Sequence, residues 1–94
     1  MKQGYIYIMG NDRPTLYVGV TSDLQKRVYE HKYLKGSSFT SKYNLRKLLY
    51  YEAIDTINGA IIREKQIKDM NRDEKIEMIK HINPNFEDLT GKLG

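Results

Sequence analysis

Two short apolar runs separated by a tight polar loop constrain the fold of this chain more than any other feature. The first run, residues 4–9, contains Tyr5-Ile6-Tyr7, and the second, residues 16–20, contains Tyr17-Val18-Gly19. β-Branched and aromatic residues favour strands, and the intervening residues 10–15 are rich in turn formers. The sequence therefore predicts an antiparallel β-hairpin.

A helix and a third strand are predicted next. Ser22 and Gln25 have the spacing of a capping box, which indicates a helix over residues 23–34. Residues 47–54 are mainly aromatic and aliphatic and predict a strand.

Two more helices are predicted after this strand. Asp55 or Thr56 can cap the first, over residues 57–70. Asn71, with a glutamate three residues later, forms a capping-box pair that starts the second, over residues 72–82.

The order of these elements predicts the fold class. A chain of 94 residues is normally one domain, so we expect a single domain over residues 1–94, with a tail at about residues 87–94 that frays. The order ββαβαα indicates an α+β fold, in which helices flank a three-stranded antiparallel sheet.

The basic residues are concentrated in the first half of the chain. Residues 1–47 contain nine Lys and Arg against three Asp and Glu, a balance of +6, within a net charge of +4 for the whole chain. A basic half favours a polyanionic partner, because lysines and arginines that neutralise phosphates release counterions. The alternative is an ordinary solvated surface. The eight tyrosines could stack on bases or simply line a small core.

Composition also excludes several classes of protein. The chain contains no cysteine, which excludes a disulfide framework and thiolate metal sites. The N-terminal apolar stretch is too short for a signal sequence or a membrane span. We therefore expect a soluble cytoplasmic protein that does not bind membranes.

Ionisable residues interrupt the apolar faces of two predicted helices. On the helix at 23–34, His31 lies within the apolar stripe and Arg27 at its border. On the helix at 57–70, Glu64 lies within the stripe formed by isoleucines and alanine. A salt bridge from Glu64 to Arg27 or to a surface lysine would explain the carboxylate, and His31 could be a satisfied core residue. A polar site shared by sheet and helices would explain all three.

These residue types suit phosphodiester hydrolysis. Glu64 could hold Mg²⁺ or Mn²⁺, because Mg²⁺ often takes only one or two protein carboxylates. Arg27 suits a non-bridging phosphate oxygen. Tyr7 and Tyr17 would lie close on neighbouring strands, and a tyrosine can relay a proton if its pKa is lowered.

The chain resembles the GIY-YIG nuclease family over nearly its whole length. Tyr5-Ile6-Tyr7 resembles the GIY element and Tyr17-Val18-Gly19 the YIG element. Residues 23–31 resemble the helix that carries the family's arginine and a following histidine, and residues 60–68 the helix whose glutamate binds metal. Residues 83–89 resemble the closing segment of small stand-alone bacterial members, which are similar to the nuclease domain of the excision-repair endonuclease.

The resemblance implies a one-metal nuclease that uses a single Mg²⁺ or Mn²⁺ ion. The implied metal ligand is Glu64, and the implied substrate contacts are Gly19, Lys26, Lys42 and Asn83, with Asn85 as the alternative to Asn83. The implied catalytic residues are Tyr7, Tyr17, Arg27 and His31.

Two residues depart from the family pattern. Tyr5 replaces the first glycine, although Gly4 stands next to it. Val20 stands where better-characterised repair members have a lysine, so a cation near the tyrosines is missing, and Lys26 is a candidate replacement.

The function expected from these features is that of a metal-dependent DNA endonuclease of low sequence specificity, with a role in DNA repair or recombination. DNA is expected rather than RNA. The alternatives are a catalytically weak or inactive nucleic-acid-binding module and a small protein-interaction domain that retains the scaffold.

Overall fold

The computed structural model describes residues 3–33 and 43–93. It confirms the α+β fold with a three-stranded antiparallel sheet, in which β1 lies between β2 and β3. The elements are β1 (Gly4–Gly10), β2 (Leu16–Thr21), α1 (Leu24–Tyr33), β3 (Lys47–Ile54), α3 (Ile57–Lys68), α4 (Arg72–Ile82) and a short 3₁₀ helix, η1 (Leu89–Lys92).

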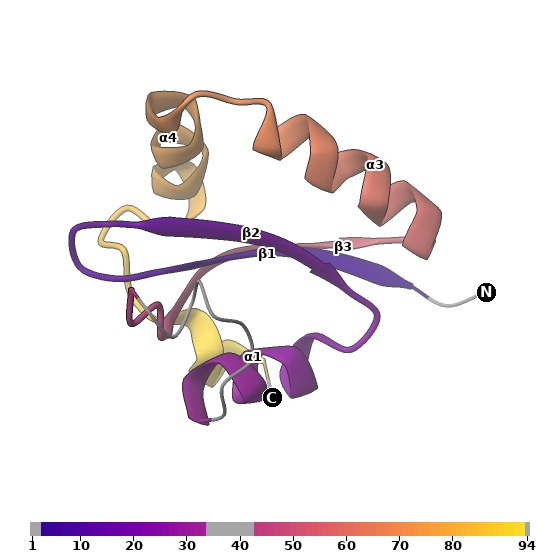
Figure 1. Cartoon of the computed structure of the whole chain (residues 1–94), viewed down its shortest axis with the longest axis horizontal. Helices are drawn as coiled ribbons and strands as arrows, with labels where there is room; N and C mark the ends of the chain where they lie inside the picture. Colours follow the sequence, from indigo (N-terminus) through magenta and orange to yellow (C-terminus); the bar gives the residue numbers. More distant parts are fainter. Residues whose placement is uncertain (1–2, 34–42, 94) are drawn as a thin grey trace.

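Helices cover both faces of the sheet. Figure 1 shows α3 and α4 above the strands and α1 below them, with the yellow C-terminal segment on the same side as α1. No helix in the described ranges is long and apolar enough to cross a membrane.

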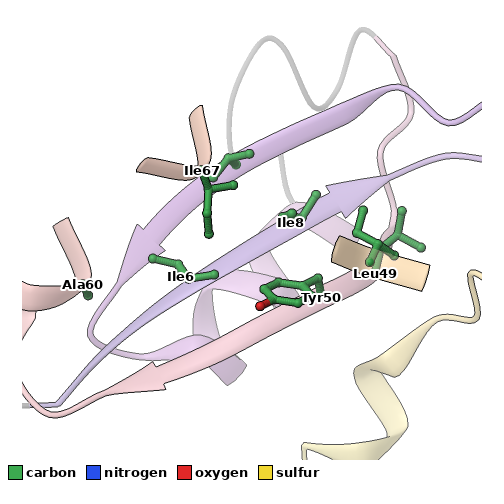
Figure 2. Packing of buried hydrophobic residues seen from close by; sticks show 8 residues of the cluster. Ile6, Ile8, Leu49, Tyr50, Ala60 and Ile67 are labelled. Carbon is green, nitrogen blue, oxygen red and sulfur yellow. The ribbon is translucent and has the colours of Figure 1, made fainter. Parts of the chain in front are cut away.

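The alternation of side chains along β1 divides the core into two clusters. Ile6 and Ile8 face α3 and α4, whereas Tyr7 and Met9 face α1 and η1. Figure 2 shows the first cluster, in which Ala60 and Ile67 of α3 pack against the sheet. The second cluster consists of Tyr7, Met9, Leu24, Val28, Leu45, Leu48 and Leu89.

The helix on the upper face lies very close to the central strand. A Cβ atom added at Gly4 would stand 2.6 Å from the Cβ of Ala60. Only glycine permits this approach, so the glycine beside Tyr5 has a packing role in seating α3 on β1.

Two of the three predicted helix starts are confirmed. Thr56 caps α3 by accepting a hydrogen bond from the Gly59 N–H at 3.0 Å. Asn71 starts α4 with a capping box. The predicted cap at Ser22 is wrong, because the Asp23 carboxylate accepts the Lys26 N–H at 3.2 Å and so caps α1 instead.

The predicted apolar stripe of α3 is correct only in part. Ala60 and Ile67 are buried, but Ile61 is 38% exposed. The sequence also did not predict a pair of hydrogen bonds from Arg63 to Glu52 of β3, at 3.0 and 2.9 Å. This ion pair joins the helix to the edge of the sheet.

The prediction that the C-terminal tail frays is wrong. The Asp88 carboxylate accepts the Leu48 N–H at 3.1 Å and forms an ion pair with Lys32 of α1. Leu89 is 8% exposed and belongs to the second core cluster. These long-range contacts hold η1 against the sheet.

Candidate active site

All four predicted catalytic residues lie on the face of the sheet that α1 covers. Tyr7 comes from β1, Tyr17 from β2, and Arg27 and His31 from α1. The ring centroids of Tyr7 and Tyr17 are 6.3 Å apart, and each lies 5.5 Å from that of His31. The three rings therefore form one aromatic group.

The position of Gly19 allows the Tyr7 ring to reach this group. Gly19 is paired with Tyr7 across the hairpin. A Cβ atom at residue 19 would stand 2.4 Å from the Tyr7 Oη and 2.5 Å from its Cζ. Gly19 leaves the space that the Tyr7 ring occupies. A glycine at this position therefore has a structural role, whether or not it also contacts substrate.

Hydrogen bonds connect Tyr7 to both candidate residues of α1. Arg27 Nε donates to the Tyr7 Oη at 3.3 Å, and the same oxygen lies 3.0 Å from His31 Nε2. A guanidinium can only donate, so the Tyr7 hydroxyl accepts from Arg27 and its own proton is available to His31. This assignment places an unprotonated Nε2 on a neutral imidazole.

Burial keeps Tyr7 and His31 neutral. It raises the pKa of Tyr7 to about 12, although the hydrogen bond from Arg27 opposes this shift. Burial and then the Arg27 charge lower the pKa of His31 to about 4. At neutral pH, Tyr7 is thus a protonated phenol and His31 an uncharged acceptor.

Accessibility separates the two tyrosines. Tyr7 is only 1% exposed, so its hydroxyl orients its neighbours and does not meet solvent. Tyr17 is half-buried on the outer strand and lines a shallow hollow of about 270 Å³. Tyr17 is therefore the phenol of the pair that can face a bound substrate.

Arg27 lies at the border of the site. Its side chain is 32% exposed, and its Nη1 forms an ion pair with Glu30 at 3.3 Å. The salt bridge from Arg27 to Glu64 that the sequence left open is not formed. Arg27 thus combines an internal contact to Tyr7 with a partly accessible positive charge.

Glu64 lies on the opposite side of the sheet from this group. It belongs to α3, its side chain is 14% exposed, and its Oε2 lies 3.3 Å from the Lys68 Nζ. Of the two salt bridges considered from the sequence, Glu64 thus forms the one with a surface lysine, Lys68. Lys68 also lines the hollow beside Tyr17, so the two halves of the candidate site approach each other around the outer edge of β2.

The fit of a metal ion to these residues can be judged from the donor set. In the described ranges, no group of three or more His, Cys, Asp or Glu could hold an ion together. Glu64 alone fits an ion that keeps most of its water ligands, as Mg²⁺ commonly does. The Lys68 ammonium is the cation that such an ion would replace.

The predicted substrate contacts have different surroundings. Lys26 is exposed on α1, whereas Lys42 lies outside the described residues. Asn83 is 4% exposed, and its amide bonds the backbone of Leu49 and Glu87 at 2.9–3.0 Å. The prediction of Asn83 as a substrate contact disagrees with this burial, because its side chain joins the end of α4 to β3 and the tail.

Sequence reasoning missed two lysines near the site. Lys68 and Lys75 come from different helices and line the hollow beside Tyr17. The spacing of Glu64 and Lys68, one helical turn apart, was a usable signal for the first. The position of Lys75 depends on how α4 packs against the rest of the fold, and local sequence patterns do not predict that packing.

Comparison with known proteins agrees with the fold and the motifs. The family described as "GIY-YIG catalytic domain" matches residues 3–77. A UPF0213 protein of Syntrophus aciditrophicus is 40% identical over 85% of this chain and 93% of its own length. The UPF0213 protein HQ_3675A of Haloquadratum walsbyi is 34% identical over 79% of this chain and 83% of its own.

A solved structure is similar as well. The solution NMR structure of the UPF0213 protein BH0048 from Bacillus halodurans has a TM-score of 0.59 and 25% sequence identity, and the match covers 98% of this chain and 97% of that one. With the paired strand tyrosines, Arg27 and the α3 glutamate in place, the chain belongs to the GIY-YIG catalytic domain family, a family of endonucleases, and is similar to its small UPF0213 members.

Proposed function

We propose that this protein is a metal-dependent endonuclease that hydrolyses phosphodiester bonds of DNA with low sequence specificity. The observation that carries the proposal is the convergence of Tyr7, Tyr17, Arg27 and His31, because ordinary packing does not require a guanidinium and an imidazole on one phenol oxygen. Family membership supports the same class of reaction.

Each residue of the aromatic group has a distinct role in this proposal. Arg27 holds a non-bridging phosphate oxygen, since guanidinium groups bind phosphate through paired N–H donors. Tyr17 orients the attacking water from the accessible side of the group. Tyr7 and His31 hold Arg27 and Tyr17 in place and are positioning residues, because both are buried.

Glu64 is the proposed ligand of a single Mg²⁺ or Mn²⁺ ion. When bound, the ion would stabilise charge on the phosphoryl oxygens and lower the pKa of a coordinated water. The protein's part is to present one carboxylate at a largely buried position and to release Lys68 from it.

DNA is the proposed substrate, and the basic residues of this chain can contact its phosphates. Phosphate contacts position a nucleic acid without reading its bases, so low sequence specificity is expected. Such an activity suits the processing of damaged or branched DNA, and we propose a role in DNA repair or recombination in the cytoplasm.

A nucleic-acid-binding module with weak catalysis is the second candidate. Val20 leaves the tyrosines without the cation found in repair members of the family, and burial makes the Tyr7 phenol harder to deprotonate. This candidate predicts salt-sensitive binding of DNA without cleavage under any divalent ion.

A plasmid-nicking assay tests the first proposal. Purified protein is incubated with supercoiled DNA and Mg²⁺ or Mn²⁺, and Glu64→Gln is compared with Glu77→Gln, which changes an exposed carboxylate of α4. We expect nicking by the wild type and by Glu77→Gln, and a loss of at least about 100-fold in Glu64→Gln. Equal activity of the Glu64 variant would rule out the metal-ligand role.

A further inference from the structure

Two lysines from different helices converge on the outer edge of β2. Lys68 at the end of α3 and Lys75 in α4 line the same hollow of about 270 Å³, together with Leu16, Tyr17 and Val18 of the strand. The strand is the outer one of the sheet, so this hollow opens beside the accessible tyrosine of the candidate active site.

The charges around this hollow are not balanced. Lys68 is paired with Glu64 at 3.3 Å, but its side chain remains 53% exposed. Lys75 is half-buried, and within residues 3–33 and 43–93 its ammonium group has no ion pair or side-chain hydrogen bond. Two cations and one carboxylate leave a net positive charge next to Tyr17.

Val20 of β2 supplies no charge to this edge of the sheet. Its side chain packs with the core cluster that α3 covers, on the side of the sheet from which Glu64 and Lys68 project. The positive charge at this edge of the sheet therefore comes from Lys68 and Lys75 of the two helices, because the strand residues that line the hollow carry none.

The geometry points to a phosphate-binding subsite formed by Lys68 and Lys75 beside Tyr17, in which Lys68 moves from Glu64 to a substrate phosphate when a divalent cation binds that carboxylate. This inference rests on the proposed function. The Lys68 side chain is 53% exposed, and ion pairs one helical turn apart are weak, so Lys68 can exchange partners. The consequence is that metal and DNA favour each other's binding.

Binding of DNA without metal tests the subsite apart from catalysis. A fluorescent 12-base-pair duplex is titrated in EDTA, and its anisotropy is followed at several salt concentrations. We expect Lys75→Ala to weaken binding about fivefold and to lower the salt slope by about one. The controls are Lys65→Ala and Lys80→Ala, which remove exposed charges from the same two helices and should change the affinity less than about twofold.

The exchange of Lys68 is tested by a double-mutant cycle in the same assay. Glu64→Gln frees Lys68 and should tighten metal-free binding about threefold, and this gain should disappear when Lys68→Ala is also present. An equal gain in both backgrounds would show general electrostatics and overturn the exchange.

Metal binding without DNA supplies an independent readout. Because the ammonium competes for Glu64, Lys68→Ala should bind Mn²⁺ about threefold more tightly than the wild type, as measured by electron paramagnetic resonance, and Lys68→Arg should restore the weaker affinity. An unchanged affinity in Lys68→Ala would overturn the proposed competition.

The two proposals can fail separately. If the wild type binds DNA through Lys68 and Lys75 but cleaves nothing, the subsite stands and the nuclease proposal fails. If the protein nicks DNA through Glu64 while the two lysines behave like Lys65 and Lys80, the subsite is overturned. Thermal unfolding of each variant confirms that the comparison is made between folded proteins.

Discussion

The phenol ring of Tyr7 lies directly over Gly19 on the neighbouring strand, so closely that a methyl group at residue 19 would meet the Tyr7 Oη at 2.4 Å. The GIY-like motif of β1 and the YIG-like motif of β2 therefore depend on each other for packing. The glycine of the second makes room for the tyrosine of the first, and that tyrosine binds Arg27 and His31.

Gly19→Ala should destabilise the protein by about 1–3 kcal/mol, because the added methyl group forces Tyr7 out of a filled core. Urea unfolding measures the change. Gly91→Ala is the matched control, since no atom lies within 4 Å of a Cβ at that position. Equal effects of the two substitutions would contradict the steric role.

Tyr7→Phe should cost about 1–3 kcal/mol of stability, because it removes the partner of two groups and leaves the buried His31 Nε2 without this hydrogen bond. Nicking activity should fall with it, since Arg27 loses its Nε acceptor. Tyr29→Phe, at a side chain that is 56% exposed, should change neither quantity. An active, fully stable Tyr7→Phe would show that the network positions nothing.

His31 should titrate near pH 4, as followed by the NMR chemical shifts of its ring. Its unfolded pKa is about 6.5, so between these values the unfolded state binds more protons and stability decreases as the pH falls. The contribution of the neutral His31 to stability is fully present above about pH 6.5 and is lost progressively toward pH 4. His31→Phe should flatten this part of the curve, whereas His81→Phe, on the exposed face of α4, should not.

Asp88→Asn should loosen the C-terminal segment, at a cost of about 1–2 kcal/mol. Burial opposes ionisation, but hydrogen bonds from Lys32, Thr90 and the Leu48 N–H lower the pKa of Asp88 to about 2. Its stabilising effect is therefore present above the ordinary value of 3.8 and lost as the pH falls through 2. Faster hydrogen exchange of the Leu48 amide would report the change, and Glu77→Gln serves as the control.

Asn83→Ala should lower stability by about 1–3 kcal/mol and leave DNA binding unchanged, since its amide bonds only backbone groups and it is 4% exposed. Asn85→Ala, at an exposed position, should have almost no effect on stability. Thermal unfolding and the anisotropy assay together measure both outcomes. Weaker DNA binding by a still folded Asn83→Ala would restore Asn83 as a substrate contact.

Local patterns predicted most elements because their causes lie within a few residues. The caps at Thr56 and Asn71 use donors three residues away, and strand alternation places Tyr7 and Tyr17 on one face. The tail was misjudged because its anchors are distant, with Asp88 bonded to Leu48 and Leu89 packed into the core. No window around residues 87–94 contains those partners.

The candidate site divides in the same way. The sequence alone determined the hairpin and, through the resemblance of its motifs, the family and the candidates Tyr7, Tyr17, Arg27 and His31. Strand alternation places the two tyrosines on one face of the sheet, and the helical period places Arg27 and His31 on one side of their helix. Only the tertiary structure decided that α3 holds Glu64 on the other face, paired with Lys68, and that Lys75 joins Lys68 beside Tyr17. The physical reason is that packing of helices around a sheet edge depends on contacts between distant segments, which local periodicity does not record.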